Sequence, residues 1–267
     1  MEATIKLMLP ALQGLAMDAA RAINRVAADA RASAKIKADG SPVTGADLAA
    51  EEAILPGLRR MTPDLPIVSE EACSGDQLVA GVMALTLAES IAAAGLFWLV
   101  DPLDGTREFL ADNGEYTVNI ALVTPERPLL GVICLPATGE VYWGGDGLGA
   151  WRQLPNQEPV AIKVRLVPPT GPVVLASRRH GDTASLDRFL ADWPGAQLAN
   201  AGSSLKFCRL AEGRADLYPR FGPTCEWDTA AGHAILAAAG GSVRTLDGQP
   251  LAYGKLRFHN PEFVARA

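Results

Sequence analysis

Cysteine and histidine are scarce in this sequence, and their positions exclude two common kinds of protein. Among 267 residues there are four cysteines and three histidines. The cysteines include no Cys-x-x-Cys pair and no secretory signal precedes them, which indicates reduced thiols in a cytosolic protein and not a disulfide framework. The histidines are not closely spaced, which argues against a zinc site.

We expect neither a signal peptide nor a membrane-spanning segment in this sequence. Glu2 stands where a secretory signal would be basic. Residues 78–96 are apolar, but they contain Glu89 and many alanines, so we interpret them as a packed helix. We therefore expect a cytoplasmic protein with no transmembrane segment. Peripheral association with the inner membrane stays open, and so does the oligomeric state, monomer or weak dimer.

Excess positive charge is absent as well. The chain carries 24 basic and 30 acidic residues, a net charge of -6. This argues against nucleic acid as a partner, because nucleic-acid binding needs a basic face. It leaves room for a small anionic substrate, because bound metal ions can invert a local field. Hydrophobic residues make up 49% of the chain, enough for a sizeable core.

The N-terminal part of the chain mixes helices with an antiparallel sheet. Residues 5–31 have the apolar spacing of an amphipathic helix. A second helix is expected to begin near Gly45 and to end at Pro56 or shortly after it. A short strand, "LPIVSEE", ends in two glutamates. Residues 116–152 are short β-rich runs separated by Pro, Gly and Asn, the pattern of an antiparallel meander.

Beyond Pro168 the pattern changes to strands that alternate with helices. This alternation indicates an α/β half with a central sheet. We predict two domains, 1–165 with an α+β half and antiparallel sheet, and 166–267 with an α/β half, so that the fold class is α+β and α/β combined. At 267 residues the chain is long enough for two medium domains.

The stretch "WLVDPLDGTREF" places two carboxylates at the end of an apolar strand. Asp101 precedes a proline, which favours extended geometry. Pro102 fixes its own φ and cannot extend a ladder, so Asp101 and Asp104 can project from one rigid corner. Gly105 lets a backbone N–H approach a ligand, and Thr106 is expected to open a short helix, whose start can bind an anion. A plain turn is the alternative, although two buried carboxylates are costly without partners.

Other acids also stand at the ends of predicted elements. Glu70 and Glu71 end a strand, Asp47 lies at the start of the second helix, and Asp228 starts the helix "DTAAGHAILAAAGG". Individually, the aspartates could be helix caps and the glutamates could be solvated. Together they form a set of hard oxygen ligands that suits Mg²⁺, which prefers carboxylates, waters and substrate phosphate.

Basic and hydroxyl residues near element ends are candidates to bind a substrate. The segment "SRRH" places His180 after a strand, "GSSLKF" places Ser203 and Lys206 at a helix start, and Arg220 ends the strand "LYPR". Such groups can hold a second, unreacting phosphate or stack on a base. Ordinary surface charge is the alternative.

Several stretches resemble the inositol monophosphatase superfamily of magnesium-dependent, lithium-sensitive phosphatases. "WLVDPLDGT" and "EWDTAAGHAILAAAGG" resemble its two signatures, and they specify only the superfamily. "DGSPVTGADLAAEEAIL", "IVSEE" and "GSSLKFCRLAEGRADLYPRFGPTCEWDTAAGH" look like the CysQ branch, the 3′(2′),5′-bisphosphate nucleotidases of sulfur assimilation. The resemblance covers roughly residues 37–241. Arg179 departs from the branch, which usually has serine there.

The resemblance implies a five-layer αβαβα sandwich of the inositol monophosphatase and fructose-1,6-bisphosphatase type. It also implies a role for each matching residue. The implied metal ligands are Glu70, Asp101, Leu103 through its carbonyl, Asp104 and Asp228. The implied catalytic residues are Thr106, Asp47 and Glu71. The implied substrate-binding residues are Glu70, Leu103, Asp104, Gly105, Thr106, His180, Ser203, Lys206, Arg220 and Asp228.

The activity that the resemblance implies is hydrolysis of the 3′-phosphate of adenosine 3′,5′-bisphosphate to AMP and phosphate. Two or three Mg²⁺ ions would serve as cofactor, and the sulfated analogue of the nucleotide is a further candidate substrate. An inositol monophosphatase or sugar bisphosphatase with the same chemistry is the first alternative. A non-catalytic nucleotide- or metal-binding protein is the second.

Overall fold

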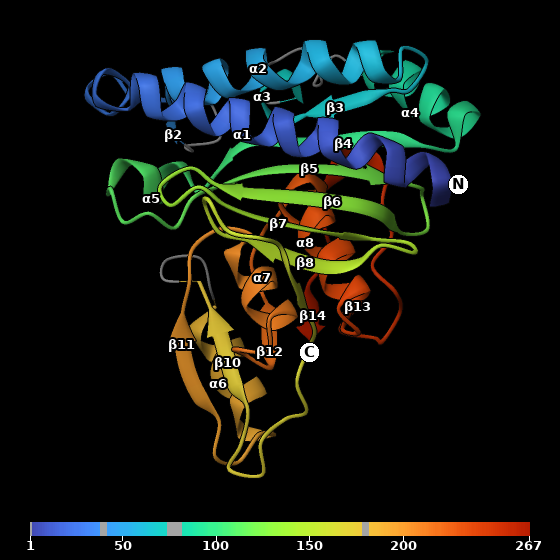
Figure 1. Ribbon diagram of the computed structural model, residues 1–267. Helices are drawn as coiled ribbons and strands as arrows, with labels where there is room; N and C mark the ends of the chain where they lie inside the picture. The colour runs from blue at the N-terminus through green and yellow to red at the C-terminus, as the bar shows by residue number, and fades with distance from the viewer. Residues whose placement is uncertain (1, 38–41, 74–81, 178–181) are drawn as a thin grey trace.

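A computed structural model describes residues 2–37, 42–73, 82–177 and 182–267 (Figure 1). It consists of two β-sheets separated and covered by helices. The helices are α1 (Glu2–Ala32), α2 (Gly45–Met61), α3 (Glu70–Cys73), α4 (Val82–Ala94), α5 (Thr106–Leu110), α6 (Thr183–Ala191), α7 (Leu205–Ala211) and α8 (Glu226–Ala238), with a 3₁₀ turn η1 (Leu256–Phe258).

The larger sheet has seven strands in sequence order. Strands β3 and β4 are parallel, and every later neighbour is antiparallel. The meander expected for residues 116–152 is therefore confirmed. The strands are β3 (Ile67–Ser69), β4 (Phe97–Asp104), β5 (Thr117–Val123), β6 (Pro128–Leu135), β7 (Glu140–Gly145), β8 (Gly149–Gln153) and β9 (Val160–Ile162); β1 (Lys35–Ile36) and β2 (Pro42–Val43) form a separate pair.

Both faces of the larger sheet are buried, because helices cover each of them. Along β4, Trp98 and Val100 pack in a core with α1 and α2, whereas Phe97 and Leu99 pack in a second core with α7 and α8. This alternation follows from the two-residue period of a strand. Figure 1 shows α1 and α2 lying along one side of the sheet and α8 on the other.

The smaller sheet has the strand order β11-β10-β12-β14-β13. Strand β10 is parallel to both neighbours; the chain passes from β10 to β11 in one direction and then from β11 back past β10 to β12 in the other. Right-handed crossovers then place α6 and α7 on opposite faces of this sheet. The strands are β10 (Val173–Ala176), β11 (Gln197–Asn200), β12 (Leu217–Arg220), β13 (Ser242–Thr245) and β14 (Phe263–Arg266).

The layers therefore follow the order αβαβα, and the predicted sandwich is confirmed. Helices α1 and α2 form one outer layer, α7 and α8 lie between the sheets, and α6 covers the far face. In the middle layer, the Phe207 ring of α7 packs edge-on against Tyr218 of β12 and stacks on Phe263 of β14. The division into domains at residue 165 stays a prediction, since α8 from the second half packs on the sheet of the first.

The structure bears on two expectations about helices, the end of α2 and the lack of a membrane-spanning helix. Helix α2, expected to end at Pro56 or shortly after it, passes Pro56 and ends at Met61, because Leu58 is fully buried and Gly57 packs against Leu15 of α1. This packing outweighs the missing proline N–H. In the described part of the chain, no helix is long and apolar enough to cross a membrane.

Helix α8 lies close to the larger sheet because a glycine permits the contact. A Cβ added at Gly131 of β6 would lie 2.3 Å from the carbonyl oxygen of Ala231 in α8. Backbone atoms cannot yield to such an overlap as a side chain can. Gly131 therefore fixes the height of α8 above the sheet, and with it the position of Asp228 at the start of that helix.

We expect Gly131→Ala to lower the free energy of unfolding by about 1–3 kcal/mol, the usual cost of overpacking a core. Gly14→Ala is the matched control, because a Cβ at Gly14 in α1 meets nothing within 4 Å. That change should stabilise the protein by about 0.5–1 kcal/mol. Urea unfolding measures both. Equal stability of the two variants would contradict the proposed contact.

Candidate active site

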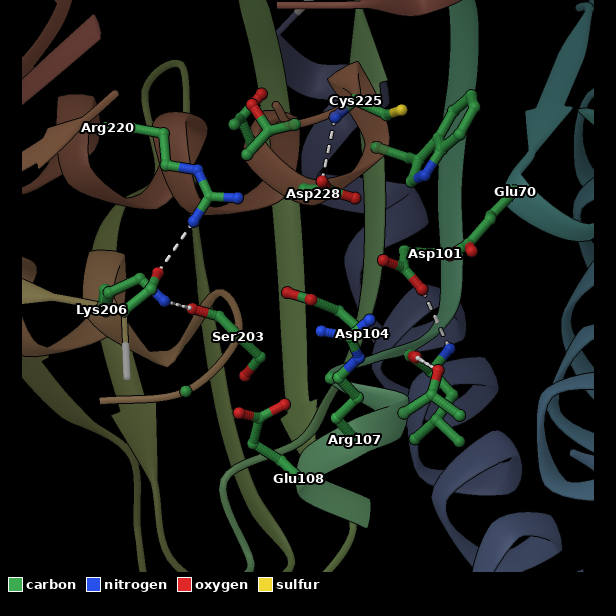
Figure 2. A pocket seen from close by; sticks show the side chains of 18 of the residues that line it. Glu70, Asp101, Asp104, Arg107, Glu108, Ser203, Lys206, Arg220, Cys225 and Asp228 are labelled. Atoms are coloured by element: carbon green, nitrogen blue, oxygen red, sulfur yellow. Dashed lines mark hydrogen bonds between the residues drawn. The ribbon is translucent and has the colours of Figure 1, made fainter. Parts of the chain in front are cut away.

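One cavity lies where the two halves of the chain meet. Its volume is about 530 Å³, within the range of small-molecule sites. Residues of the larger sheet line one side and residues of α7, β12 and the start of α8 line the other (Figure 2). Ten predicted site residues line it, namely Glu70, Asp101, Leu103, Asp104, Gly105, Thr106, Ser203, Lys206, Arg220 and Asp228.

The first wall of the cavity is a β-bulge in β4. Asp101 pairs with Asn119 and Asp104 pairs with Thr117, so β4 has one residue more than β5 between these two pairs. Pro102 sits within the bulge, where its missing N–H costs no ladder hydrogen bond. The Oδ1 atom of Asp101 accepts from the N–H of Leu103 at 3.0 Å, which holds the corner rigid.

Gly105 turns the chain from β4 into α5. Its φ of 90° lies in the left-handed region that favours glycine. A Cβ there would also crowd the Cβ of Ser203 at 3.3 Å. Thr106 begins α5, as expected from the sequence.

Asp47 and Asp228 occupy equivalent positions, each the third residue of its helix. The Oδ2 atom of Asp47 accepts from the N–H of Thr44 at 2.7 Å, and that of Asp228 accepts from the N–H of Cys225 at 2.9 Å. Both are capping boxes, so the capping alternative holds for one oxygen of each carboxylate. The Oδ1 atom of Asp47 accepts from the Thr106 hydroxyl at 3.3 Å, so one aspartate both caps α2 and contacts the cavity wall.

Ser204 joins the two halves of the site. Its N–H donates to Asp104 Oδ2 at 2.6 Å, and its Oγ lies 2.9 Å from the same oxygen and 2.6 Å from the Asp228 carbonyl. The side-chain amide of Asn119 donates to Ser204 Oγ at 2.9 Å. Ser204 and Asn119 are buried, and they fix Asp104 of β4 relative to Asp228 of α8.

The carboxylates face one another in a poorly solvated space (Figure 2). Burial raises the pKa of Asp101, and the charges of Glu70, Asp104 and Asp228 raise it further. Burial, then the charges of Asp104 and Glu70, likewise raise the pKa of Asp228. Such a set needs a cation nearby to keep its members ionised.

Lys37 supplies positive charge at one side of the set. Its Nζ lies 2.9 Å from Glu70 Oε1 and 2.6 Å from Glu71 Oε1. Burial raises the pKa of Glu71 to about 7, although the hydrogen bond and charge of Lys37 oppose this. Among the described residues, no three Asp, Glu, His or Cys side chains converge closely enough to enclose a metal ion.

The basic residues that the second half of the chain contributes to the cavity form more hydrogen bonds to backbone carbonyls than expected. The Lys206 ammonium donates to the carbonyls of Ser203 at 2.7 Å and Ala201 at 3.2 Å, and burial lowers its pKa to about 8. Arg220 donates to the carbonyls of Gly222 and Pro223. These two cations therefore hold the cavity walls in place.

Ser203 lines the cavity in a strained backbone conformation. Its φ of 43° lies in the left-handed region, and its buried Oγ has no hydrogen-bond partner among the described residues. Both features are costly unless a ligand uses them. His180, together with Arg178 and Arg179, lies outside the described residues. Of the expected catalytic residues, Glu71 and Asp47 stand behind the cavity lining, in contact with Lys37 and Thr106 respectively.

Sequence reasoning missed Ser204, Asn119 and Lys37. Ser204 and Asn119 stand within the stretches "GSSLKF" and "YTVNIALV", where they read as a helix start and a strand residue. Lys37 stands in a turn-rich loop. Their importance arises only from contacts with residues 24 to 100 positions away, which no local pattern reports.

Comparison with known proteins places this geometry in a family context. The model of the inositol monophosphatase family matches residues 7–265. A curated relative, the 3′(2′),5′-bisphosphate nucleotidase CysQ of Escherichia coli K12, is 46% identical over 228 residues, which cover 85% of this chain and 86% of that protein.

Solved structures agree with this result. CysQ from Bacteroides thetaiotaomicron superposes with a TM-score of 0.78 at 35% identity and covers 96% of both chains. An inositol monophosphatase from Zymomonas mobilis gives a TM-score of 0.74 at 27% identity, over 98% of this chain and 92% of that one. The chain is thus similar to both branches in fold and more similar to CysQ in sequence.

The raised pKa of Glu71 predicts a pH dependence for the metal-free protein. Its folded-state pKa of about 7 exceeds the ordinary 4.5, so the stability that its neutral form contributes is lost as the pH rises from about 4.5 through 7. In chelator, the melting temperature of Glu71→Gln minus that of the wild type should therefore increase by a few degrees between pH 4.5 and pH 8.

Comparing the variant with the wild type removes the contribution of His233, whose pKa burial lowers to about 4 and which acts in the opposite sense. Melting temperatures followed by circular dichroism at several pH values give the answer. A difference between the two proteins that does not change with pH would contradict the shifted pKa.

Proposed function

The chain belongs to the inositol monophosphatase family, and from this premise we propose that it is a Mg²⁺-dependent 3′(2′),5′-bisphosphate nucleotidase. It would hydrolyse the 3′-phosphate of adenosine 3′,5′-bisphosphate, or of its sulfated analogue, to release inorganic phosphate. One observation carries the proposal: carboxylates from both halves of the chain meet in one cavity beside a Thr106–Asp47 pair.

The chemistry of the cavity's donor groups suits a divalent cation, although in the described residues no three of these side chains converge closely enough to enclose one. Asp101, Asp104 and Asp228 are hard oxygen donors, and their mutual repulsion in a buried space favours bound positive charge. Glu70 and the Leu103 carbonyl would complete the set for two or three ions. When bound, Mg²⁺ would neutralise phosphate oxygens and lower the pKa of a bound water.

Each of the three aspartates is oriented by a hydrogen bond to one of its oxygens. The Oδ1 atom of Asp101 and the Oδ2 atoms of Asp104 and Asp228 accept from backbone N–H groups. This bond fixes the orientation of the carboxylate, and its other oxygen remains available for a ligand. A site oriented in this way loses little freedom when a cation binds, which favours a defined geometry.

Thr106 and Asp47 would position the attacking water. Because the Thr106 hydroxyl donates to Asp47 Oδ1, its lone pairs remain to accept a hydrogen bond from water. The water oxygen is then directed at phosphorus for in-line attack, and the bond from phosphorus to the 3′-oxygen breaks without a covalent enzyme intermediate. Catalysis of this kind is mostly positioning and charge neutralisation.

The second-half wall of the cavity would bind the rest of the nucleotide. Ser203 and the cations Lys206 and Arg220 lie on this side, opposite Glu70 and Asp101 (Figure 2). His180 is retained as a proposed contact from the sequence. Cytoplasmic location, peripheral membrane association and oligomeric state stay predictions.

A substrate panel tests the proposed function. Phosphate release from adenosine 3′,5′-bisphosphate, inositol monophosphate and fructose 1,6-bisphosphate would be measured side by side, with Mg²⁺ and with excess chelator. The nucleotide should be hydrolysed fastest, and chelator should abolish release. A preference for inositol phosphate or a sugar bisphosphate would favour the first alternative, and no turnover of any substrate would favour a binding protein.

Asp104→Asn should abolish turnover while leaving the fold intact. Replacing the carboxylate by an amide weakens a hard-cation site, so kcat/KM should fall at least roughly 100-fold, the upper range for residues that merely orient metal ligands. Asp112→Asn is the control, since Asp112 is exposed and pairs with Arg31. Phosphate release and circular dichroism measure the two effects. A folded variant with wild-type activity would remove Asp104 from the site.

Lys206→Met separates substrate recognition from chemistry. The loss of a charge-assisted contact costs about 1.5–3 kcal/mol, which is roughly a tenfold to hundredfold lower kcat/KM, mostly through KM. A small phosphate ester without the nucleotide should be hydrolysed as before. Steady-state kinetics on both substrates is the measurement. Equal losses on both would instead assign Lys206 to the metal centre or the fold.

A further inference from the structure

The ion pairs of Lys37 involve the same carboxylates that we propose for the metal site. Lys37 lies just after β1, and its Nζ contacts Glu70 Oε1 at 2.9 Å and Glu71 Oε1 at 2.6 Å. Its side chain is 8% exposed, so these contacts are shielded from water. Although burial opposes protonation, the charges and hydrogen bonds of Glu70 and Glu71 raise the pKa of Lys37, which is therefore charged at neutral pH.

The positive charge of Lys37 also affects the pKa of another acid at the site. It lowers the pKa of Asp47, against the larger opposing effect of burial. Glu70 in turn raises the pKa values of Asp101 and Asp228, so the residue that Lys37 holds is part of the repelling set. Lys37 is thus a cation attached to one edge of the carboxylate cluster.

We propose that Lys37 acts as an internal counter-ion that competes with the divalent cation for Glu70. In the metal-free protein, its ammonium group neutralises the edge of the carboxylate set. A divalent ion bound by Glu70 takes over that oxygen and repels the ammonium at short range. Lys37 therefore stabilises the metal-free fold and weakens cation binding. This inference rests on the proposed metal dependence.

The competition predicts a change in a direction that an ordinary structural residue would not give. Removing one partner of a buried ion pair destabilises a protein, so the melting temperature of Lys37→Gln in chelator should fall by roughly 5 °C or more. At the same time, loss of the competing charge should tighten Mg²⁺ binding by about tenfold. A lower melting temperature together with a higher Mg²⁺ affinity in the same variant would identify the competition.

Isothermal titration calorimetry with Mg²⁺ and thermal melts in chelator test this directly. Lys37→Arg keeps the charge, and Lys35→Gln removes an exposed lysine from the neighbouring strand β1. Both controls should bind Mg²⁺ within about twofold of wild type, because neither removes the charge that faces Glu70. Lys37→Gln with unchanged or weaker Mg²⁺ affinity would overturn the proposal.

A second measurement uses the wild-type protein and does not depend on the variant folding. Lysine amidination followed by peptide mass spectrometry reports how accessible each ammonium group is. Mg²⁺ should speed the labelling of Lys37 at least about twofold and leave Lys35 unchanged, because a released ammonium loses one of its two carboxylate partners. Equal labelling of Lys37 with and without Mg²⁺ would contradict the competition. Wild-type protein that binds no Mg²⁺ would instead contradict the proposed function itself.

Discussion

The repulsion among buried carboxylates at the meeting point of the two sheets is the constraint on which the site depends. Asp101 and Asp104 come from the end of one strand, Asp228 from the start of a helix in the other half, and Glu70 from the first residue of the short helix α3. Burial and like charge raise the pKa values of Asp101 and Asp228, so the folded chain without a cation is held in an unfavourable state. The fold tolerates this because packing elsewhere, including the close approach of α8 to β6, is extensive.

The backbone orients these acids by a recurring device. Asp47 and Asp228 each use one oxygen to complete a capping box, and Asp104 uses one oxygen to receive Ser204. These backbone contacts therefore fix the direction of the second oxygen of each carboxylate, and no additional supporting structure is needed. Ser204 has the further effect of linking β4 to α8, so it connects the two halves of the proposed metal site.

Much of this could be predicted from the sequence, since the relevant signals are local. Apolar periodicity indicates the helices and the meander, and "DPLDGT" indicates a rigid acidic corner. The layer order and site roles came from the family resemblance. What could not be predicted depends on distant contacts: the extension of α2 past Pro56 follows from packing on α1, and Ser204, Asn119 and Lys37 acquire roles only through residues far away in sequence. Lys206 and Arg220 show the converse, since side chains expected to face a ligand also donate to backbone carbonyls.

A crystal structure grown with Mn²⁺ tests the central claim most directly, because anomalous scattering locates the ion without assumptions about its ligands. We expect anomalous peaks among Asp101, Asp104 and Asp228, within bonding distance of the oxygens that the capping and Ser204 contacts leave available. Glu70 should turn from Lys37 toward an ion. Ordered Mn²⁺ elsewhere on the molecule, with none in this cavity at saturating concentration, would contradict the assignment of these carboxylates as a cation site.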